Sequence, residues 1–400
     1  MKKIGLLGML LAVLFFVPFL LLGQEECSVG VAVGKATIDG KPLLWKNRDS
    51  SDRNNSIHFF KRDNLAFVAV IKSGDTNKVW MGVNSAGFAI INSSSKDLEG
   101  KKSTENGIYM KKALELCRSV DDFGKLLRET NAKGRKTRSN FGVIDALGGG
   151  AFFETASHSF TRFDAKDSPY GYIVRTNFAV TGVKDSLSYG YQRRARANIL
   201  WLRKARKKAL SYSYIFRKVS RDLVNESAYP YPLPFAGRQD SLPKGVLYTQ
   251  NSINRFKTVS VVVFHGVSLR ENPALTTMWV ILGEPICGVA FPVWPINESL
   301  PDAISKGNPP KMNHLIQQIE AYVYPNKSNP GWLYTPRLES KTKEGILPAL
   351  MSVEDSVFSE TETQINRWQT RFRLDEMRAF QRKTVGRLLR TFERIIKANP

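Results

Sequence analysis

Cys27 is the first residue of this sequence whose type and position suit nucleophilic chemistry. It follows Glu25 and Glu26 and opens the strand-like run CSVGVAVG. A protonated thiol is a weak nucleophile and needs a base beside it. A cysteine that begins a chain carries its own base, because the α-amine has a reference pKa of about 8. The alternative is that Cys27 is a buried strand residue without a chemical role.

Three further short motifs carry polar groups that a cysteine nucleophile needs. They are KNRD at 46–49, RTNF at 175–178 and INRF at 253–256. A carboxylate such as Asp49 can hold an α-amine in place, and asparagine side chains can stabilise an oxyanion because they donate without titrating. Each motif alone is typical of a turn, but their order and separation together indicate a site.

Other chemistries find little support in the sequence. The histidines stand outside any motif, which leaves a Cys–His dyad poorly supported; they are His58, His158, His265 and His314. Cys117 and Cys287 lie in apolar patterns and are interpreted as small buried hydrophobic residues. No Cys or His pair has zinc-ligand spacing, and Gly148–Gly150 predicts a hairpin turn rather than a phosphate loop. We therefore expect no metal and no other cofactor.

The pattern around these motifs predicts antiparallel strands and helical layers. Strand-like runs follow one another from Cys27 to Ser94, return between residues 139 and 180, and return again between 259 and Trp294. Between these sets, apolar residues at helical spacing predict helix over Tyr109–Asn131 and over a basic region from Tyr191 to about Asn225. This order favours an α+β fold with layered antiparallel sheets over a parallel, doubly wound fold.

The last hundred residues differ in character from the rest. Residues 300–350 are rich in loop signals such as NPP and NKSNP, and the following stretch to Ala398 predicts one or two long basic helices. Such a stretch could lie on an anionic membrane, or it could pack on the domain with its basic face in solvent.

The formal net charge of +23 implies an anionic surface or ligand rather than nucleic acid. The basic residues are spread over several helical patterns, and no nucleic-acid-binding motif accompanies them. We therefore expect no nucleic acid partner.

The N-terminus predicts export. Met1–Lys3 is positively charged, and Ile4–Gly23 carries no charge, as in a secretory signal segment. Cleavage after Gly23 would release the protein to the periplasm or the exterior. If the segment stays uncleaved, residues 4–23 are about long enough to anchor the chain in a bilayer.

Two longer stretches, GKATIDGKPLLWKNRDSS and GVNSAGFAIIN, resemble a known family. Together with Cys27, they are similar to N-terminal nucleophile (Ntn) hydrolases of the choloylglycine hydrolase and penicillin V acylase group. The resemblance is strongest to the acyl-CoA:6-aminopenicillanic acid (isopenicillin N) acyltransferase branch. It implies a four-layer αββα sandwich over residues 27–300, followed by a helical C-terminal extension over residues 301–400.

The resemblance also implies roles for particular residues. Asp49 would hold the amine of Cys27, Asn92 and Asn177 would stabilise the oxyanion, and Arg255 would place positive charge near the thiolate. Lys46 stands where bile-salt hydrolases carry arginine, so that Arg48 is an alternative for that role.

Self-processing is a further implication. With a signal segment at 1–23, residues 24–26 form a short pro-segment, and Cys27 would attack the carbonyl of Glu26 to release it. The mature chain would then begin at Cys27.

The expected substrate is a small acyl amide or thioester whose acyl group passes to Cys27 and then to water or an amine. Aromatic residues in SIHFFKRD and YPYPLPF are candidates for the substrate pocket or, equally, for the core: Phe59, Phe60 and Tyr231. The sequence does not distinguish hydrolase from acyltransferase and says nothing of the oligomeric state. The alternative function is that of an inactive, envelope-associated binding protein on the same scaffold.

Overall fold

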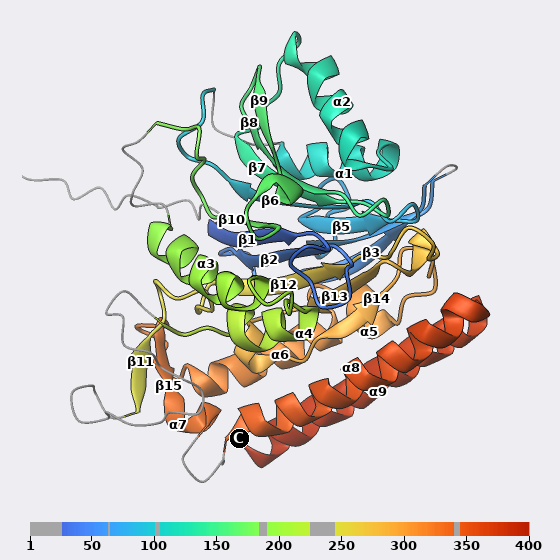
Figure 1. Ribbon diagram of the computed structural model, residues 1–400. Helices are drawn as coiled ribbons and strands as arrows, with labels where there is room; N and C mark the ends of the chain where they lie inside the picture. The colour runs from blue at the N-terminus through green and yellow to red at the C-terminus, as the bar shows by residue number, and fades with distance from the viewer. Residues whose placement is uncertain are drawn as a thin grey trace, which may run out of the picture.

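The computed structural model describes residues 26–62, 65–100, 105–183, 190–224, 245–339 and 345–399. Within these ranges the chain forms two large antiparallel sheets stacked face to face between helical layers (Figure 1). The signal segment, residues 24–25 of the pro-segment and Tyr231 lie outside the described residues. The predicted α+β sandwich with a C-terminal helical region is confirmed.

The first sheet contains six strands and carries Cys27. Their order across the sheet is β10 (Tyr172–Arg175), β1 (Glu26–Ala32), β2 (Leu43–Asp49), β12 (Thr258–His265), β13 (Thr277–Ile281) and β14 (Phe291–Val293). Hydrogen bonding to β10 on one side and to β2 on the other makes β1 an internal strand. Its backbone is therefore held on both sides.

The second sheet contains seven strands in simple meander order. They are β3 (Asn55–Phe60), β4 (Phe67–Lys72), β5 (Met81–Asn84), β6 (Ala89–Ser94), β7 (Ser139–Ile144), β8 (Gly150–Thr155) and β9 (Phe160–Asp164). The turn between β7 and β8 contains Gly148 at φ +83°, as predicted for the glycine triplet. A separate two-stranded ribbon joins β11 (Val246–Tyr248) to β15 (Trp332–Tyr334).

Two helices cover the outer face of the seven-stranded sheet, α1 (Asn106–Leu116) and α2 (Val120–Asn131). The sequence pattern predicts one helical stretch here, but the chain breaks at Cys117–Ser119. Ser119 caps α2, since its side chain accepts from the Asp122 amide while Asp122 accepts from the Ser119 amide. This reciprocal capping box begins a new helix where the apolar periodicity alone shows no interruption.

The remaining helices cover the outer face of the six-stranded sheet. They are α3 (Tyr191–Ala205), the short α4 (Tyr212–Tyr214) with the π-helical turn Ile215–Ser220, α5 (Asp302–Ser305), α6 (Lys311–Val323), α7 (Thr335–Leu338), α8 (Ile346–Thr370) and α9 (Leu374–Ala398). Three short 3₁₀ turns complete the described elements: Ala165–Asp167, Pro273–Leu275 and Pro285–Cys287.

Residues 300–350 are less irregular than the sequence suggests, because α6 lies among them. Its apolar side chains Met312, Leu315, Ile316 and Ile319 are buried in the core shared with the six-stranded sheet. The C-terminal helices join that core through Leu350, Val357, Leu388 and Phe392. The described part of residues 301–400 thus packs on the two-sheet sandwich.

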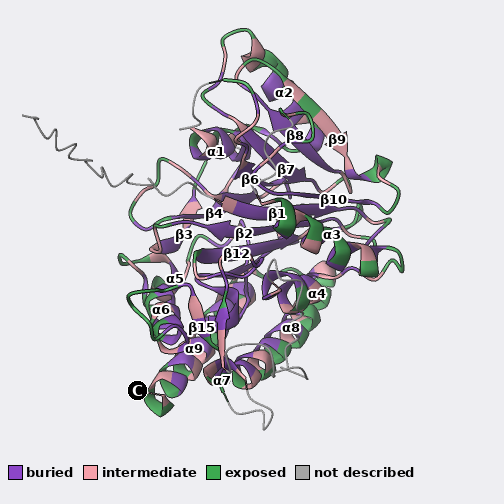
Figure 2. Cartoon of the chain, turned by 90° about the vertical axis from the view of Figure 1, so that its left-hand side faces the viewer, coloured by how far each residue is buried: buried purple, intermediate pink, exposed green. Residues whose placement is uncertain are grey.

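Burial follows the layers (Figure 2): the central strands of both sheets are buried and the edge strand β9 is only partly buried, whereas the outward faces of α2 and α3 are exposed. No helix within the described ranges is both long and apolar enough to cross a membrane.

Gly30 determines how closely α3 approaches β1. A Cβ atom at Gly30 would lie 2.6 Å from the ring of Trp201, a distance no side chain tolerates. Trp201 lies on the buried face of α3 together with Arg193 and Ala197. The contact places this helix face directly against one side of β1.

Candidate active site

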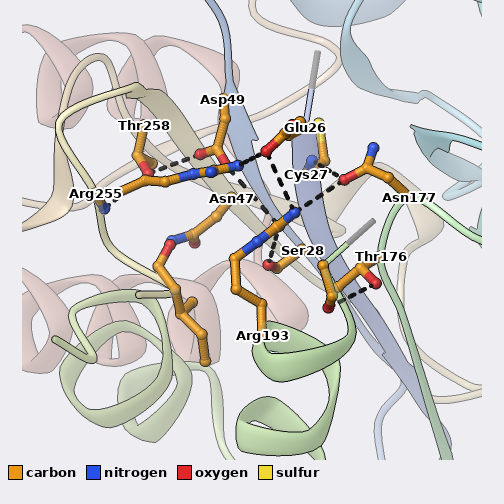
Figure 3. Close-up of polar contacts among 12 residues, drawn as sticks. Glu26, Cys27, Ser28, Asn47, Asp49, Thr176, Asn177, Arg193, Arg255 and Thr258 are labelled. Atoms are coloured by element: carbon orange, nitrogen blue, oxygen red, sulfur yellow. Dashed lines mark hydrogen bonds and ion pairs between the residues drawn. The ribbon is translucent and has the colours of Figure 1, made fainter. Parts of the chain in front are cut away.

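Cys27 is the second residue of β1 and is fully buried. Because strand side chains alternate, Cys27, Val29 and Val31 share a face, and Val31 contacts Gly150 of the seven-stranded sheet. Glu26, Ser28 and Gly30 point the opposite way, toward α3. The thiol therefore lies on the face between the two sheets, and Figure 3 shows its sulfur directed away from Arg193.

The backbone nitrogen of Cys27 has a specific acceptor. It donates to Asn177 Oδ1 at 2.9 Å, and Asn177 Nδ2 donates to the Ser94 carbonyl at 3.0 Å. The second bond fixes the orientation of the amide, so that its oxygen faces Cys27. The structure places Asn177 against Cys27 as a hydrogen-bond acceptor for the nitrogen in the uncleaved chain, which differs from the oxyanion-donor role that the resemblance implies.

Asp49 ends β2 and lies opposite Glu26 in the strand pairing. Its carboxylate accepts from Arg255 Nε at 2.7 Å and from Thr258 Oγ1 at 2.7 Å. Arg255 also donates through Nη2 to Glu26 Oε2 at 2.8 Å. Asp49 and Arg255 are therefore joined to each other next to the Glu26–Cys27 peptide bond (Figure 3).

Arg193 is a site residue that sequence reasoning missed. It lies in the first turn of α3 and is only 3% exposed. Its guanidinium donates to Ser28 Oγ at 2.9 Å and to Asn177 Oδ1 at 3.1 Å, and lies 3.9 Å from Asp49 and 3.8 Å from Glu26. Arg193 therefore connects the acceptor of the Cys27 nitrogen to the carboxylates on the other side.

The charged groups around Glu26 shift one another's pKa values. Burial lowers the pKa of Arg193, and the neighbouring Arg255 lowers it further, to about 10. Burial also acts to lower the pKa of Arg255, but Asp49 and Glu26 outweigh it and raise that pKa. Burial would raise the pKa of Glu26, yet Arg255, Arg193 and Lys96 hold it below its ordinary value. Arg193, Arg255 and Glu26 are therefore charged at neutral pH.

Lys46 and Asn92 form a second polar group on the thiol face. Lys46 Nζ donates to Asn92 Oδ1 at 2.8 Å and to the Trp80 carbonyl at 3.0 Å. Asn92 Nδ2 donates to Ser139 Oγ at 3.1 Å. The structure thus pairs Asn92 with Lys46.

Arg48 lies directly opposite Cys27 in the strand pairing. It donates to Asn55 Oδ1 at 2.9 Å, and its guanidinium lies 4.3 Å from the centre of the Trp80 ring. Arg48 and Lys46 are therefore both buried cations on the Cys27 face of the sheet.

The aromatic candidates lie in packed positions. Phe60 stacks on Phe67 at 4.4 Å and belongs to the core beneath α1 and α2, on the far side of the seven-stranded sheet. Phe59 is half-buried against the other core. Phe60 is therefore a core residue, which is one of the two alternatives that the sequence left open.

The other two thiols are unsuited to nucleophilic attack. Burial raises the pKa of Cys117 to about 12, and burial likewise raises the pKa of Cys287. Both stay protonated at neutral pH.

A cavity of about 190 Å³ opens beside Glu26. Its described lining consists of Glu26, Gly190, Tyr191, Gln192, Arg193, Asn251 and Arg255. It lies on the α3 side of β1. Solvent-sized molecules can therefore approach the residue that precedes Cys27.

Part of the chain matches a known protein family. Residues 36–232 match the family described as acyl-coenzyme A:6-aminopenicillanic acid acyl-transferase. The matched stretch contains Asp49, Asn92 and Asn177 and ends before Arg255. The match confirms the resemblance to this branch of the Ntn hydrolases. No curated protein matches the chain.

Three solved structures are similar to this chain at low sequence identity. A conjugated bile acid hydrolase variant from Clostridium perfringens is 14% identical, with a TM-score of 0.39, covering 64% of this chain and 89% of its own. The penicillin V acylase of Agrobacterium tumefaciens is 14% identical, with a TM-score of 0.41, covering 70% and 88%. A Caenorhabditis elegans orthologue of N-acylethanolamine-hydrolyzing acid amidase is 14% identical, with a TM-score of 0.41, covering 62% and 94%.

Proposed function

We propose that this chain is a cysteine Ntn amidohydrolase or acyltransferase whose nucleophile is Cys27 and whose base is the α-amine of Cys27. The observation that carries the proposal is the hydrogen bond from the Cys27 nitrogen to Asn177 Oδ1. It holds the one nitrogen that scission would turn into an amine, on a buried residue and through an oxygen that also accepts from Arg193. The match over residues 36–232 supports the reaction class.

The first step of the proposal is self-processing. The Cys27 thiol loses its proton and adds to the Glu26 carbonyl carbon, and the bond from that carbon to the Cys27 nitrogen breaks as the nitrogen gains a proton. The product is a thioester, which water hydrolyses to the Glu26 carboxylic acid, a free thiol and a free amine. Arg255, itself bonded to Asp49, holds the Glu26 side chain during this step.

Turnover repeats this chemistry on a substrate. The α-amine takes the thiol proton, the sulfur attacks the substrate carbonyl, and the leaving amine departs with a proton. Water or a second amine then releases the acyl group from Cys27. In this proposal Asn177 orients the amine, and Asn92, on the thiol face, donates to the oxyanion. Because Asn92 Nδ2 donates to Ser139 Oγ in the uncleaved chain, the oxyanion must share or replace that bond.

We further propose that the chain is exported by its N-terminal segment and that processing follows export. The basic outer faces of the C-terminal helices are candidates for peripheral contact with an anionic membrane. These proposals rest on the sequence.

The test is the mass of the full-length protein after expression with its own N-terminus. The wild-type chain should begin at Cys27, and Cys27→Ala should keep residues 24–26. An electrophilic thiol probe should label Cys27 in the wild type and abolish hydrolysis of N-acyl amides. A stable, active wild type that begins at Gln24 would contradict self-processing.

Cys27→Ser is the matched control, since it keeps a nucleophile of similar size. If Cys27→Ser hydrolyses a panel of N-acyl amides as fast as the wild type, the thiol is not the nucleophile. If no member of the panel is hydrolysed and Cys27 is never labelled, the alternative of an inactive binding protein is favoured.

A further inference from the structure

In the uncleaved chain, the Glu26 carboxylate lies in an anion-binding site formed by positively charged side chains. Its carboxylate accepts from Arg255 Nη2 at 2.8 Å, lies 3.8 Å from Arg193 Nη2, and lies 3.6 Å from Lys96 Nζ. Arg193 and Arg255 are 3% and 4% exposed, so both guanidinium groups are almost removed from water. The site faces the cavity of about 190 Å³.

Scission of the Glu26–Cys27 bond would change the charge balance of this site. Before scission, the guanidinium groups of Arg193 and Arg255 face two carboxylates, those of Glu26 and Asp49. Once Glu26 leaves, Asp49 is the carboxylate that remains beside these two guanidinium groups. Buried guanidinium groups without enough counter-charge are costly, so the vacated position favours another anion.

The position of that anion relative to Cys27 follows from the chemistry. In self-processing, the thiol attacks the carbonyl carbon of Glu26, and in turnover it attacks the carbonyl carbon of the substrate. The side chain of Glu26 therefore stands where the acyl chain of a substrate stands. Its carboxylate is separated from the attacked carbonyl by three carbon atoms, which is the spacing of a glutaryl group.

We propose that the mature enzyme prefers amides whose acyl group carries a carboxylate at glutaryl spacing, held by Arg193 and Arg255 in the position that Glu26 vacates. This inference rests on the proposed function, because it requires Cys27 to be unmasked. Cys27 Sγ forms a thioester with the glutaryl carbonyl carbon as the amine departs with a proton. Water then releases glutarate and restores the thiol.

The experiment compares two substrates of equal length on the self-processed wild-type protein. They are the glutaryl and the glutaramoyl amides of 4-nitroaniline, which differ only in a terminal carboxylate or carboxamide. We expect kcat/KM to be about 10- to 100-fold higher for the glutaryl amide, the range that a charged hydrogen-bonded pair provides. Equal values, or faster cleavage of the neutral or a fatty-acyl amide, would overturn the inference.

Arg193→Gln tests the site itself. Because Arg193 also contacts Asn177 and Ser28, this variant should lose activity on both substrates, and the informative quantity is the ratio of the two kcat/KM values. The ratio should fall toward one, and Arg193→Lys should keep part of it. A ratio that stays at the wild-type value in Arg193→Gln would overturn the assignment. If the variants do not fold, protection of wild-type Cys27 from the thiol probe by glutarate, compared with butyrate, gives the same answer.

Glu26→Gln is the matched control because residue 26 is absent from the mature chain. Processing should slow in this variant, while the processed protein should keep the wild-type substrate ratio. A changed ratio would mean that residue 26 stays in the site and would overturn the inference. Absence of both Cys27 labelling and processing in the wild type would instead refute the proposed function, and the inference with it.

Discussion

Two arginine–carboxylate clusters lie in the same sandwich and differ in how their charges are paired and in how far their carboxylates are buried. In the first, Arg221 and Glu354 form two parallel hydrogen bonds, of 2.8 and 2.7 Å, with side chains 1% and 0% exposed. Arg221 also donates to the carbonyls of Pro285 and Gly288, and Glu354 accepts from the Ala290 amide. One cation meets one anion in direct hydrogen-bond contact.

The second cluster surrounds Glu26, and its cations and carboxylates are paired differently. Arg193 and Arg255 share Asp49 and Glu26, and one side of the cluster opens onto a cavity. One of its two carboxylates belongs to a residue that we propose is removed. The closed pair joins α8 to Arg221, directly after the π-helical turn, and to the segment before β14. The open cluster, by contrast, can exchange its anion.

The largest expected effect on stability comes from breaking the closed Arg221–Glu354 pair. Glu354→Gln leaves Arg221 buried without its anion and should lower the free energy of unfolding by about 3–5 kcal/mol, measured by denaturant unfolding. The double variant Arg221→Met/Glu354→Leu should recover part of this loss, although the Ala290 amide stays unpaired. A loss below about 1 kcal/mol in Glu354→Gln would contradict the distinction between the clusters.

The next effect concerns catalysis in the open cluster. Asn177→Ala removes the acceptor of the Cys27 nitrogen and should lower kcat by about 10²–10³-fold, measured on the processed fraction. Asn177→Asp keeps an acceptor oxygen and should lose less. Equal losses in both variants would show that the acceptor is not the feature that matters.

The smallest effect concerns Glu26 in the uncleaved protein. In the Cys27→Ala background, Glu26→Gln should cost less than about 1 kcal/mol of stability at pH 7, because the Glu26 side chain is 39% exposed. Arg255 and Arg193 hold the pKa of Glu26 below its ordinary 4.5. Its contribution is therefore complete above about pH 4.5 and is lost as the pH falls through the lowered pKa.

The measurement is thermal or denaturant unfolding of both proteins between pH 7 and pH 3. The difference between Cys27→Ala and the double variant should shrink as the pH falls. A difference that grows at low pH, or one as large as that of Glu354→Gln, would make Glu26 a structural anion like Glu354.

The sequence predicts the strands well because alternation and turn residues are local signals. The run from Cys27 and the KNRD motif become adjacent strands, with Cys27 opposite Arg48 and Glu26 opposite Asp49. The break between α1 and α2 was missed since the capping box at Ser119 interrupts no apolar period. The helix α6 was missed because its flanking prolines and loop residues dominated the pattern around 300–350.

The site was predicted in part for a similar reason. Asp49, Asn177 and Arg255 stand in short motifs and meet around residues 26 and 27. Arg193 stands in a helix with many basic residues, and in the sequence it is indistinguishable from its solvated neighbours. Spacing from Ala197 and Trp201 is the signal that could have identified it, because these residues place Arg193 on the buried face of α3.

The glycine at position 30 connects the backbone of β1 to the charge of the site. Trp201 rests on Gly30 where any side chain would collide with it, and Arg193 lies about two turns earlier on the same helix face. The absence of a side chain at Gly30, three residues after Cys27, therefore determines how far the Arg193 guanidinium reaches toward Asn177 and Glu26. Gly30 touches neither substrate nor thiol, yet a larger residue at this position would have to displace Trp201 and α3, and Arg193 would move with them.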